Sequence, residues 1–302
     1  MSLRIALVTD DPGWHGARLR AAFARLDCEV RRVSLTECGI DTGGGTAGLC
    51  IPGFEDALPD GVFVRGVPGG TLEQVVLYLD VLHALRALGV PVYNNGRAIE
   101  KSVDKGMTSL LLQRAGVATP PTWVTADSAR AAAVWRRERA AGHRLVVKPL
   151  FGSQGRGLRR LSRRDRLPPA DSCQGVYYLQ RYVEGAGGDW RVFVVNGRAV
   201  AGMQRCGRGW INNVAQGATC IPVVNDPELE RLAEAAVAAL EMDYAGVDLM
   251  RDADGALQVI EVNSIPAWKG LQAVCSVDIA QSLADDFHAR YLCRREPVAV
   301  SA

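Results

Sequence analysis

The stretch YAGVDLMRDADGALQVIEVNSIPAWKG, residues Tyr244–Gly270, decides how we interpret this chain. Apolar residues dominate Val247–Met250 and resume in Leu257–Val262. Between them lies Asp252–Gly255, whose two Asp residues and Gly are typical of a turn. The sequence therefore predicts two strands joined in a hairpin.

Three oxygen-bearing side chains interrupt the apolar pattern of this hairpin: Asp248, Glu261 and Asn263. Glu261 and Asn263 are two residues apart, so they face the same side of a strand, and the hairpin would bring Asp248 beside them. Two carboxylates and an amide oxygen on one face repel one another unless a hard cation lies between them. Because Mg²⁺ binds such oxygens and completes its shell with substrate phosphates, we predict a metal site here. The alternative is a hairpin with a solvated face.

The composition is that of a globular protein with a sizeable core. The 302 residues suffice for two or three domains, and 48% of them are hydrophobic. No apolar run approaches the ~18–20 residues of a membrane span, and the first residues do not resemble a signal peptide. The formal net charge of +2 is too balanced to indicate a nucleic-acid or membrane surface, and arginine pairs such as Arg159-Arg160 are expected to be solvated. The eight cysteines include no CxxC pair, so we expect reduced thiols in a cytoplasmic protein.

The first hundred residues show the strand–helix–strand order of an open α/β layer with a parallel sheet. We expect strands at residues 3–9, 29–34, 62–65 and 90–93, helices at 17–26 and 71–88, and a turn at 94–97. Residues 38–59 are rich in Gly, Thr and Pro and are predicted to form a flexible loop. Gly43–Gly45 suggests a phosphate loop, but it lacks the Gly-Lys-Ser/Thr ending, so we interpret it as part of that loop.

A second informative point is Lys148, near the end of the apolar strand predicted at residues 144–149. A lysine within an apolar run requires an anionic partner. The Gly-rich loop Phe151–Gly157 follows directly, and its backbone N–H groups, together with the Ser153 hydroxyl, could surround an anion. Because Lys148 precedes the glycines, this is not a Walker loop.

The strand predicted at residues 175–183 ends in the Gly-rich segment Glu184–Gly188. Such a hinge could present backbone groups to an adenine edge and the Glu184 carboxylate to a ribose; a plain strand and loop is the alternative. A hairpin then follows at residues 189–205, with a type I′ turn at Asn196-Gly197. Arg191 and Arg205 project from its strands and are suited to phosphate or carboxylate contact, surface charge being the alternative.

The order of these motifs resembles the ATP-grasp superfamily: a strand lysine, a Gly-rich loop, a strand leading to a hinge, an arginine hairpin and a final carboxylate–amide set. Within it, KPLFGSQGRG, DWRVFVVNGRAVAGMQR, NNVAQGA, YAGVDL and EVNSIPAWKG resemble the RimK-like α-L-glutamate ligases, which add glutamate to ribosomal-protein tails and to cofactors such as tetrahydromethanopterin. The resemblance implies an α/β ATP-grasp fold. It places a pre-ATP-grasp domain at residues 1–100, a central lobe at 101–187, a C-terminal lobe at 188–295 and a tail at 296–302.

Carried over position by position, the resemblance places ATP between the two lobes. Asp248, Glu261 and Asn263 would hold one or two Mg²⁺ ions, or Mn²⁺, while Arg205 and Lys148 would be catalytic. The residues implied to contact the nucleotide, most of them around the phosphates or the adenine hinge, are Lys105, Lys148, Gly152, Ser153, Gln154, Gly155, Gln180, Tyr182, Val183, Glu184, Asp189 and Asn213.

The activity that the resemblance implies is an ATP-dependent carboxylate–amine ligase. An acceptor carboxylate would attack the γ-phosphorus to give an acyl phosphate and ADP, and the amine of an amino acid, expected to be L-glutamate, would attack the acyl carbon. The expected acceptor is a small molecule such as a tetrahydromethanopterin-type cofactor, or a peptide, and homo-oligomers are usual among such relatives. The alternatives are an ATP-grasp ligase of D-alanine or glutathione type, and a nucleotide-binding module without catalysis.

The sequence departs from the pattern of these relatives in two places. Ile211–Asn213 lacks the basic residue expected before a Gly-rich strand. From the last predicted metal ligand onward, many relatives read N-x-S-P-G, whereas this chain reads NSIPAWKG over Asn263–Gly270, which places Trp268 and Lys269 beside the predicted metal. We expect Trp268, Lys269 and Arg191 to face the substrate, since a flat ring or an anionic tail would suit an indole beside a lysine. A packed Trp268 is the alternative.

Overall fold

The computed structural model describes residues 2–11, 13–152, 155–185, 188–207, 209–210 and 217–293. Two compact units are present, one from the segments 1–99, 242–244 and 265–302 and the other from 100–241 and 245–264. Helix α3 (Gly96–Val103) carries the chain from the first unit into the second, where the sequence predicted a turn at residues 94–97. The division into a first domain, two lobes and a tail stays a prediction; residues 265–293 group with the first unit.

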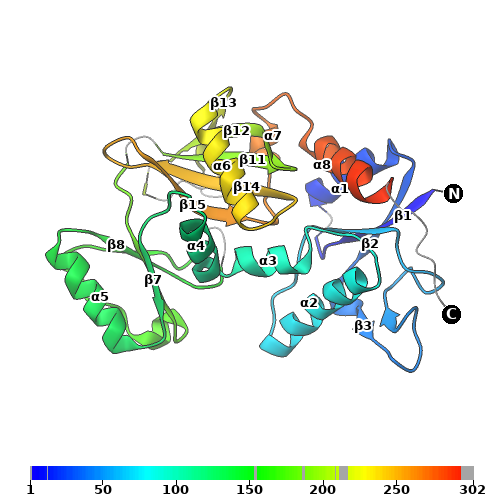
Figure 1. The fold of residues 1–302 in the computed structure, drawn as a ribbon, viewed down its shortest axis with the longest axis horizontal. Coiled ribbons are helices and arrows are strands. Elements are labelled where there is room, and N and C mark those ends of the chain that lie inside the picture. The colour runs from blue at the N-terminus through cyan, green and yellow to red at the C-terminus, as the bar shows by residue number, and fades with distance from the viewer. Residues whose placement is uncertain are drawn as a thin grey trace. The chain divides into compact units, whose positions relative to one another are not determined.

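The first unit is built on a parallel sheet with the strand order β2-β1-β5-β6. Its strands, each within a few residues of the predicted one, are β1 (Leu3–Val8), β2 (Cys28–Val33), β5 (Gly61–Val64) and β6 (Val92–Tyr93). All of β5 is buried, because helices cover both faces of the sheet. Figure 1 shows α1 (Gly13–Ala24) and α8 (Ile279–Phe287) on one face and α2 (Leu72–Ala87) on the other.

Helix α8 packs closely on β5 at Gly61. A Cβ atom on Gly61 would lie only 2.6 Å from the Phe287 ring, so a larger residue would push the helix away. The rings of Phe23, Phe63 and Phe287 meet edge to face, with centroids 5.8, 6.1 and 6.2 Å apart, a favourable geometry for aromatic pairs. After α8 the helical path continues as η4 (His288–Leu292).

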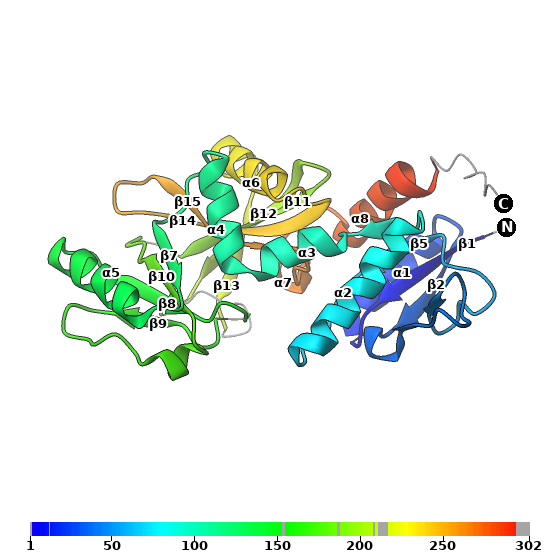
Figure 2. The ribbon, with the colours of Figure 1, turned by 60° about the horizontal axis from the view of Figure 1, so that its bottom comes forward.

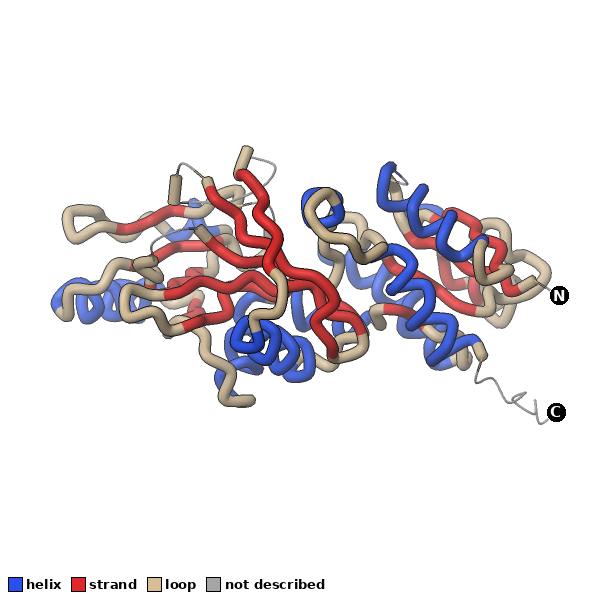
Figure 3. The backbone as a smooth tube through the Cα atoms, turned by 90° about the horizontal axis from the view of Figure 1, so that it is seen from above, coloured by secondary structure: helices blue, strands red, loops and turns tan. Residues whose placement is uncertain are grey.

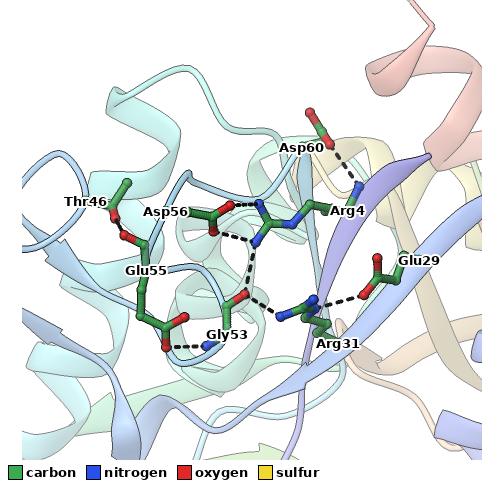
Figure 4. A network of polar contacts seen from close by, with 8 residues as sticks. All are labelled: Arg4, Glu29, Arg31, Thr46, Gly53, Glu55, Asp56 and Asp60. Atoms are coloured by element: carbon green, nitrogen blue, oxygen red, sulfur yellow. Dashed lines mark hydrogen bonds and ion pairs between the residues drawn. The ribbon is translucent and has the colours of Figure 1, made fainter. Parts of the chain in front are cut away.

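Residues 38–59, which the sequence predicted as a flexible loop, are held by polar contacts (Figure 4). After η1 (Leu35–Glu37), they contain the short hairpin of β3 (Gly39–Ile40) and β4 (Leu49–Cys50). Arg4 donates to the carboxylate of Asp56 at 3.0 and 3.1 Å and to the carbonyl oxygen of Gly53 at 3.0 Å. Arg31 donates to the same carbonyl oxygen at 3.0 Å. The segment is therefore anchored to the sheet at Gly53 and Asp56, while its flexibility stays a prediction.

The second unit contains two sheets. The first has the order β7-β10-β8-β9 and consists of β7 (Thr122–Thr125), β8 (Leu145–Lys148), β9 (Arg159–Leu161) and β10 (Tyr177–Arg181). The second has the order β13-β12-β11-β14-β15 and consists of β11 (Asp189–Val195), β12 (Arg198–Cys206), β13 (Thr219–Val223), β14 (Tyr244–Arg251) and β15 (Leu257–Asn263). Figure 3 shows the strands gathered into sheets with helices against them.

Helices and tight turns complete the second unit. Helix α5 (Ser128–Ala140) covers one face of the β7-β10-β8-β9 sheet (Figure 2) and buries Trp135 there. The other elements are α4 (Lys105–Arg114), η2 (Ala170–Cys173) and α6 (Pro227–Ala239), while α7 (Lys269–Gln272) belongs to the first unit. The predicted turn between β11 and β12 is confirmed, since Asn196 and Gly197 have φ values of 50° and 69°, as a type I′ turn requires. Among the described residues, no helix is both long and apolar enough to span a membrane.

Candidate active site

The hairpin of β14 and β15 has the arrangement that the sequence predicted. Asp248 lies directly opposite Glu261, and Asn263 lies opposite Gly246, so the three oxygen-bearing side chains share one face. The register shifts immediately after Asp248, and such bulges are frequent beside active sites because they re-aim a side chain. Asp248 is only 6% exposed, whereas Glu261 and Asn263 are partly buried.

Two arginines of neighbouring strands neutralise Asp248. Arg191 on β11 donates from Nε to Oδ1 and from Nη2 to Oδ2, each at 2.7 Å. Arg205 on β12 lies 3.0 Å from Oδ2 through its own Nη2, and it donates to the two carboxylate oxygens of Asp189 at 2.6 and 2.9 Å. The sequence predicted a metal ion between carboxylates; in the structure, guanidinium groups supply part of the compensating charge.

The network shifts the pKa values of its two aspartates in opposite directions. Burial by itself raises the pKa of Asp248, but Arg191 and Arg205 outweigh burial and lower that pKa to about 2. Burial raises the pKa of Asp189 to about 6, although its hydrogen bonds with Arg205 oppose the shift. Burial lowers the pKa of Arg205, yet Asp248 and Asp189 outweigh burial and raise it. Asp248 is therefore ionised, and Arg205 charged, at neutral pH.

Arg191 and Arg205 each have N–H donors that these carboxylates do not use. Their contacts with Asp248 and Asp189 use Nε and Nη2, and within the described part of the chain Nη1 of Arg191 and of Arg205 donates to no residue. A guanidinium held along one edge by a carboxylate can still present its remaining N–H groups to a second anion. Asp248 and Asp189 thus orient two guanidinium groups whose remaining N–H donors are available to a ligand.

The oxygens on this face fit a magnesium ion. An ionised carboxylate has about four lone-pair sites, of which the arginines occupy about three at Asp248. Glu261 has no hydrogen bond or ion pair with any described residue. Nδ2 of Asn263 is buried and has no hydrogen-bond partner in the described ranges. Those ranges hold no group of three His, Cys, Asp or Glu residues placed for a metal. A magnesium site on this face would therefore need the amide oxygen of Asn263 beside the two carboxylates.

Lys148 and Lys105 lie together in the second unit. Lys148 ends β8, is buried, and lies opposite Tyr178 of β10, with Nζ 5.8 Å from the ring centroid. Burial lowers the pKa of Lys148 to about 8, opposed by Glu261 and assisted by Lys105. Burial likewise lowers the pKa of Lys105, whose Nζ donates to the carbonyl oxygen of Gly152 at 2.7 Å. Lys105 therefore holds the start of the Gly-rich loop.

The Gly-rich loop leaves β8 in a conformation that requires glycine. Gly157 has a φ of 75°, and a Cβ atom there would lie 2.8 Å from Cγ of Pro149. Gly152 is exposed and Gly155 is partly buried. Three predicted nucleotide contacts, Ser153, Gln154 and Asn213, lie outside the described residues. Contact between this loop and phosphates stays a prediction.

The predicted hinge residues already have partners in the protein. Nε2 of Gln180 is buried and donates to the hydroxyls of Thr122 and Tyr178 at 3.1 and 3.0 Å. Val183 is buried, and the exposed Glu184 accepts a hydrogen bond of 2.8 Å from Arg144, which lowers the pKa of Glu184. The side chain of Gln180 thus secures β10, and adenine or ribose contact by these residues stays a prediction.

Sequence reasoning missed a cation–aromatic stack beside the hinge. The ring of Tyr182 lies 6.2 Å from that of Trp210, and the guanidinium of Arg160 lies 5.3 Å from the first centroid and 5.7 Å from the second. The guanidinium carbon of Arg144 also lies near this ring, 5.4 Å from the Tyr182 centroid. Arg160 is exposed, as the sequence predicted, but it also contacts these two rings. No sequence signal connected these residues, because they come from separate segments.

The first unit contains Trp268 and Lys269, the other predicted substrate residues. Trp268 is fully buried and Lys269 is exposed. The Trp268 ring packs edge-on against His15 at 4.6 Å, and the guanidinium of Arg65 lies 4.8 Å from its centroid. This burial favours the packed alternative for Trp268, while substrate contact by Lys269 and Arg191 stays a prediction. Sequence reasoning missed His15 and Arg65.

A family model and the relatives of similar sequence indicate the same family for this chain. Residues 102–287 match the family model of the RimK-like ATP-grasp domain. The chain is 34% identical over 233 residues to a tetrahydromethanopterin:alpha-L-glutamate ligase of Methanococcus maripaludis, covering 74% of this chain and 77% of that protein. It is 31% identical over 275 residues to a probable alpha-L-glutamate ligase of Vibrio cholerae, covering 89% of each.

A solved structure with a similar fold is that of the ATP-grasp ligase PsnB complexed with a minimal precursor. The TM-score is 0.74 at 22% identity, over 96% of this chain and 99% of that one. This likeness shows the ATP-grasp fold, which the sequence predicted. The chain belongs to the RimK-like ATP-grasp family and is an ATP-dependent ligase.

Proposed function

We propose that this ligase joins the amine of L-glutamate to a carboxylate of a small-molecule or peptide acceptor, at the expense of ATP. The observation that carries the proposal is the face on which Asp248 and Glu261 lie opposite each other beside two arginines with unused donors. Relatives named as α-L-glutamate ligases support glutamate as the amine. The relative named for tetrahydromethanopterin supports an acceptor of that type.

The chain's own residues hold the reactants and balance their charge. Arg205, oriented by Asp189 and Asp248, presents Nη1 to the γ-phosphoryl group, and Arg191 presents its Nη1 to a carboxylate or phosphate oxygen. Lys148 adds a buried positive charge near Glu261. Mg²⁺ or Mn²⁺, held by Asp248, Glu261 and Asn263, would neutralise phosphate charge. In such reactions the protein contributes mainly positioning and electrostatic stabilisation.

Two steps complete the reaction. An oxygen of the acceptor carboxylate attacks the γ-phosphorus, the bond from that phosphorus to the ADP oxygen breaks, and an acyl phosphate forms. The glutamate nitrogen then attacks the acyl carbon, the bond to the phosphate oxygen breaks, and the amine loses a proton. The products are an amide, ADP and inorganic phosphate. No side chain of the protein forms a covalent intermediate in this scheme.

The test is nucleotide turnover by the purified protein with Mg²⁺ and ATP. L-glutamate would be present or absent, and the acceptors would include tetrahydromethanopterin and short peptides ending in glutamate. We expect ADP and phosphate to form only when glutamate and an acceptor are both present. Glu261→Ala should abolish turnover, whereas the matched surface variant Glu73→Ala should retain it, because Glu73 is exposed on α2. Formation of AMP and pyrophosphate would contradict the mechanism, and turnover with another amine but not with glutamate would contradict the substrate.

A further inference from the structure

The carboxyl ends of β1 and β5 form a topological switch point in the first unit. The chain leaves β1 for β2 on one side and returns to β5 on the other side of β1. In open parallel sheets, ligands bind in the crevice at such a point. Arg65 follows β5 directly, and its backbone N–H donates to the carbonyl oxygen of Val8, the last residue of β1, at 2.8 Å. Arg65 therefore lies at the position where a ligand crevice is expected.

Arg65 is a partly buried cation without a carboxylate partner among the described residues. Its Nη1 donates to the carbonyl oxygen of Pro266 at 3.1 Å, and its guanidinium carbon lies 4.8 Å from the centroid of the Trp268 ring. Burial lowers the pKa of Arg65, while the Tyr244 hydroxyl and the charge of Asp11 oppose that shift. Burying a cation costs free energy unless an anion compensates it, and Asp11 acts on Arg65 through its charge without forming an ion pair with it.

Two neighbours add donors to the same place. Nε2 of His15 accepts a hydrogen bond of 3.1 Å from the backbone N–H of Trp268, which places the imidazole proton on Nδ1. Nδ1 has no hydrogen-bond partner within the described ranges. Burial lowers the pKa of His15 to about 4, assisted by Arg65 and Lys269 and opposed by Asp11. His15 is thus a neutral donor at physiological pH, and the exposed Lys269 supplies a second positive charge.

The backbone next to Arg65 is not crowded. A Cβ atom on Gly66, the residue after Arg65, would meet nothing nearer than Cα of Thr9 at 3.9 Å. Along the sequence, only two residues separate Asn263 from Pro266, whose carbonyl oxygen accepts the hydrogen bond from Arg65.

We propose that Arg65, with His15 and Lys269, binds a carboxylate of the acceptor and thereby selects acceptors that carry a second acidic group. The proposal rests on the proposed function, because it assigns this carboxylate to the acceptor of that reaction. Arg65 supplies a planar fork for the carboxylate oxygens, and Nδ1–H of His15 supplies a neutral donor. Asp11 opposes binding, since its negative charge acts on both Arg65 and His15.

The direct test is calorimetric titration of the full chain with glutarate, in the absence of nucleotide. We expect Arg65→Gln to weaken glutarate binding at least about tenfold, because this variant loses the charge-assisted hydrogen bonds. Arg65→Lys should weaken binding less, because it keeps the positive charge and loses only the planar geometry of the guanidinium. Asp11→Asn should tighten binding, a gain that misfolding cannot produce. Arg25→Gln is the matched control, since Arg25 is an exposed arginine of the same unit. Gly66→Val should weaken binding without any change of charge, by narrowing the crevice.

Three outcomes would overturn the proposal: absence of glutarate binding to the wild type, equal binding by wild type and Arg65→Gln, or a preference for inorganic phosphate over glutarate. A kinetic arm then tests the assignment to the acceptor. Arg65→Gln should raise the KM for a dicarboxylate acceptor at least about tenfold while the KM for ATP stays within about twofold. If glutarate binds as expected but the wild type uses no acceptor, the proposed function fails, whereas the anion site stands.

Discussion

Asp248 and Glu261 lie directly opposite each other on β14 and β15, yet only Asp248 is bound by arginine. Arg191 donates to both carboxylate oxygens of Asp248 at 2.7 Å, and Nη2 of Arg205 lies 3.0 Å from Oδ2 of Asp248. The Glu261 carboxylate has no such partner among the described residues. The two carboxylates therefore have different tasks: Asp248 orients the arginines, and Glu261 keeps its oxygens for a ligand.

Substitution of Glu261 should separate activity from stability. In Glu261→Gln, turnover should fall by about 10²–10³, the range found when one charge-stabilising group is removed from an active site. The free energy of unfolding should change by less than about 0.5 kcal/mol, because no described residue forms a hydrogen bond or ion pair with this carboxylate. Turnover measured beside urea denaturation tests both parts. Wild-type turnover in this variant would remove Glu261 from the site.

Substitution of Arg191, in contrast, should lower the stability of the fold. Arg191→Ala leaves Asp248 buried with one arginine fewer, and breaking a buried ion pair costs about 3–5 kcal/mol. We expect the free energy of unfolding to fall by about 3 kcal/mol, since Arg205 remains as a partner. The control is Arg144→Ala, which removes an exposed pair with Glu184 and should cost at most ~1 kcal/mol. Equal losses in the two variants would show that the network does not stabilise the fold.

The lowered pKa of Lys148 predicts a pH dependence of ATP binding. The charged form predominates below its pKa of about 8 and is lost as the pH rises through that value. If only charged Lys148 holds the triphosphate, the affinity for ATP should fall about tenfold one pH unit above the pKa. Lys148→Arg should abolish this dependence, because a guanidinium stays charged. Calorimetric titration with ATP across this range measures the effect, and the same slope in Lys148→Arg would assign it to another group.

The burial of Trp268 predicts a loss of stability on truncation. Removing a fully buried aromatic side chain costs about 3–5 kcal/mol, so Trp268→Ala should lower the free energy of unfolding by that amount. Trp268→Phe should cost less and should leave the acceptor KM unchanged, because it keeps a ring against His15 and Arg65. Thermal unfolding and acceptor kinetics together decide the matter. A raised acceptor KM in a stable Trp268→Phe protein would favour direct substrate contact instead.

The sequence predicted the elements whose pattern is local. Alternation and turn chemistry placed the β14–β15 hairpin and set Asp248 opposite Glu261, and Asn196-Gly197 adopts the backbone angles that its residue types favour. The first unit's parallel sheet followed from its order of strand and helix patterns. These features depend on neighbours along the chain, so periodicity is sufficient to find them.

Contacts between distant segments were not predictable in the same way. Nothing in the sequence pairs Arg191 with Asp248, places Arg160 beside Tyr182 and Trp210, or brings Arg65 to Trp268. The loop at residues 38–59 appears flexible from its Gly and Pro content, yet arginines of β1 and β2 anchor it. Such arrangements depend on which strands become neighbours in the folded chain.

The central claim, an acyl-phosphate ligase, is tested most directly by tracing oxygen. An acceptor whose carboxylate carries heavy oxygen would be converted with ATP, Mg²⁺ and L-glutamate, and the products examined by mass spectrometry. Our account predicts that one labelled oxygen leaves with inorganic phosphate, because the bond between the acyl carbon and that oxygen breaks when the amine attacks. Unlabelled phosphate, or label found in AMP, would contradict the account.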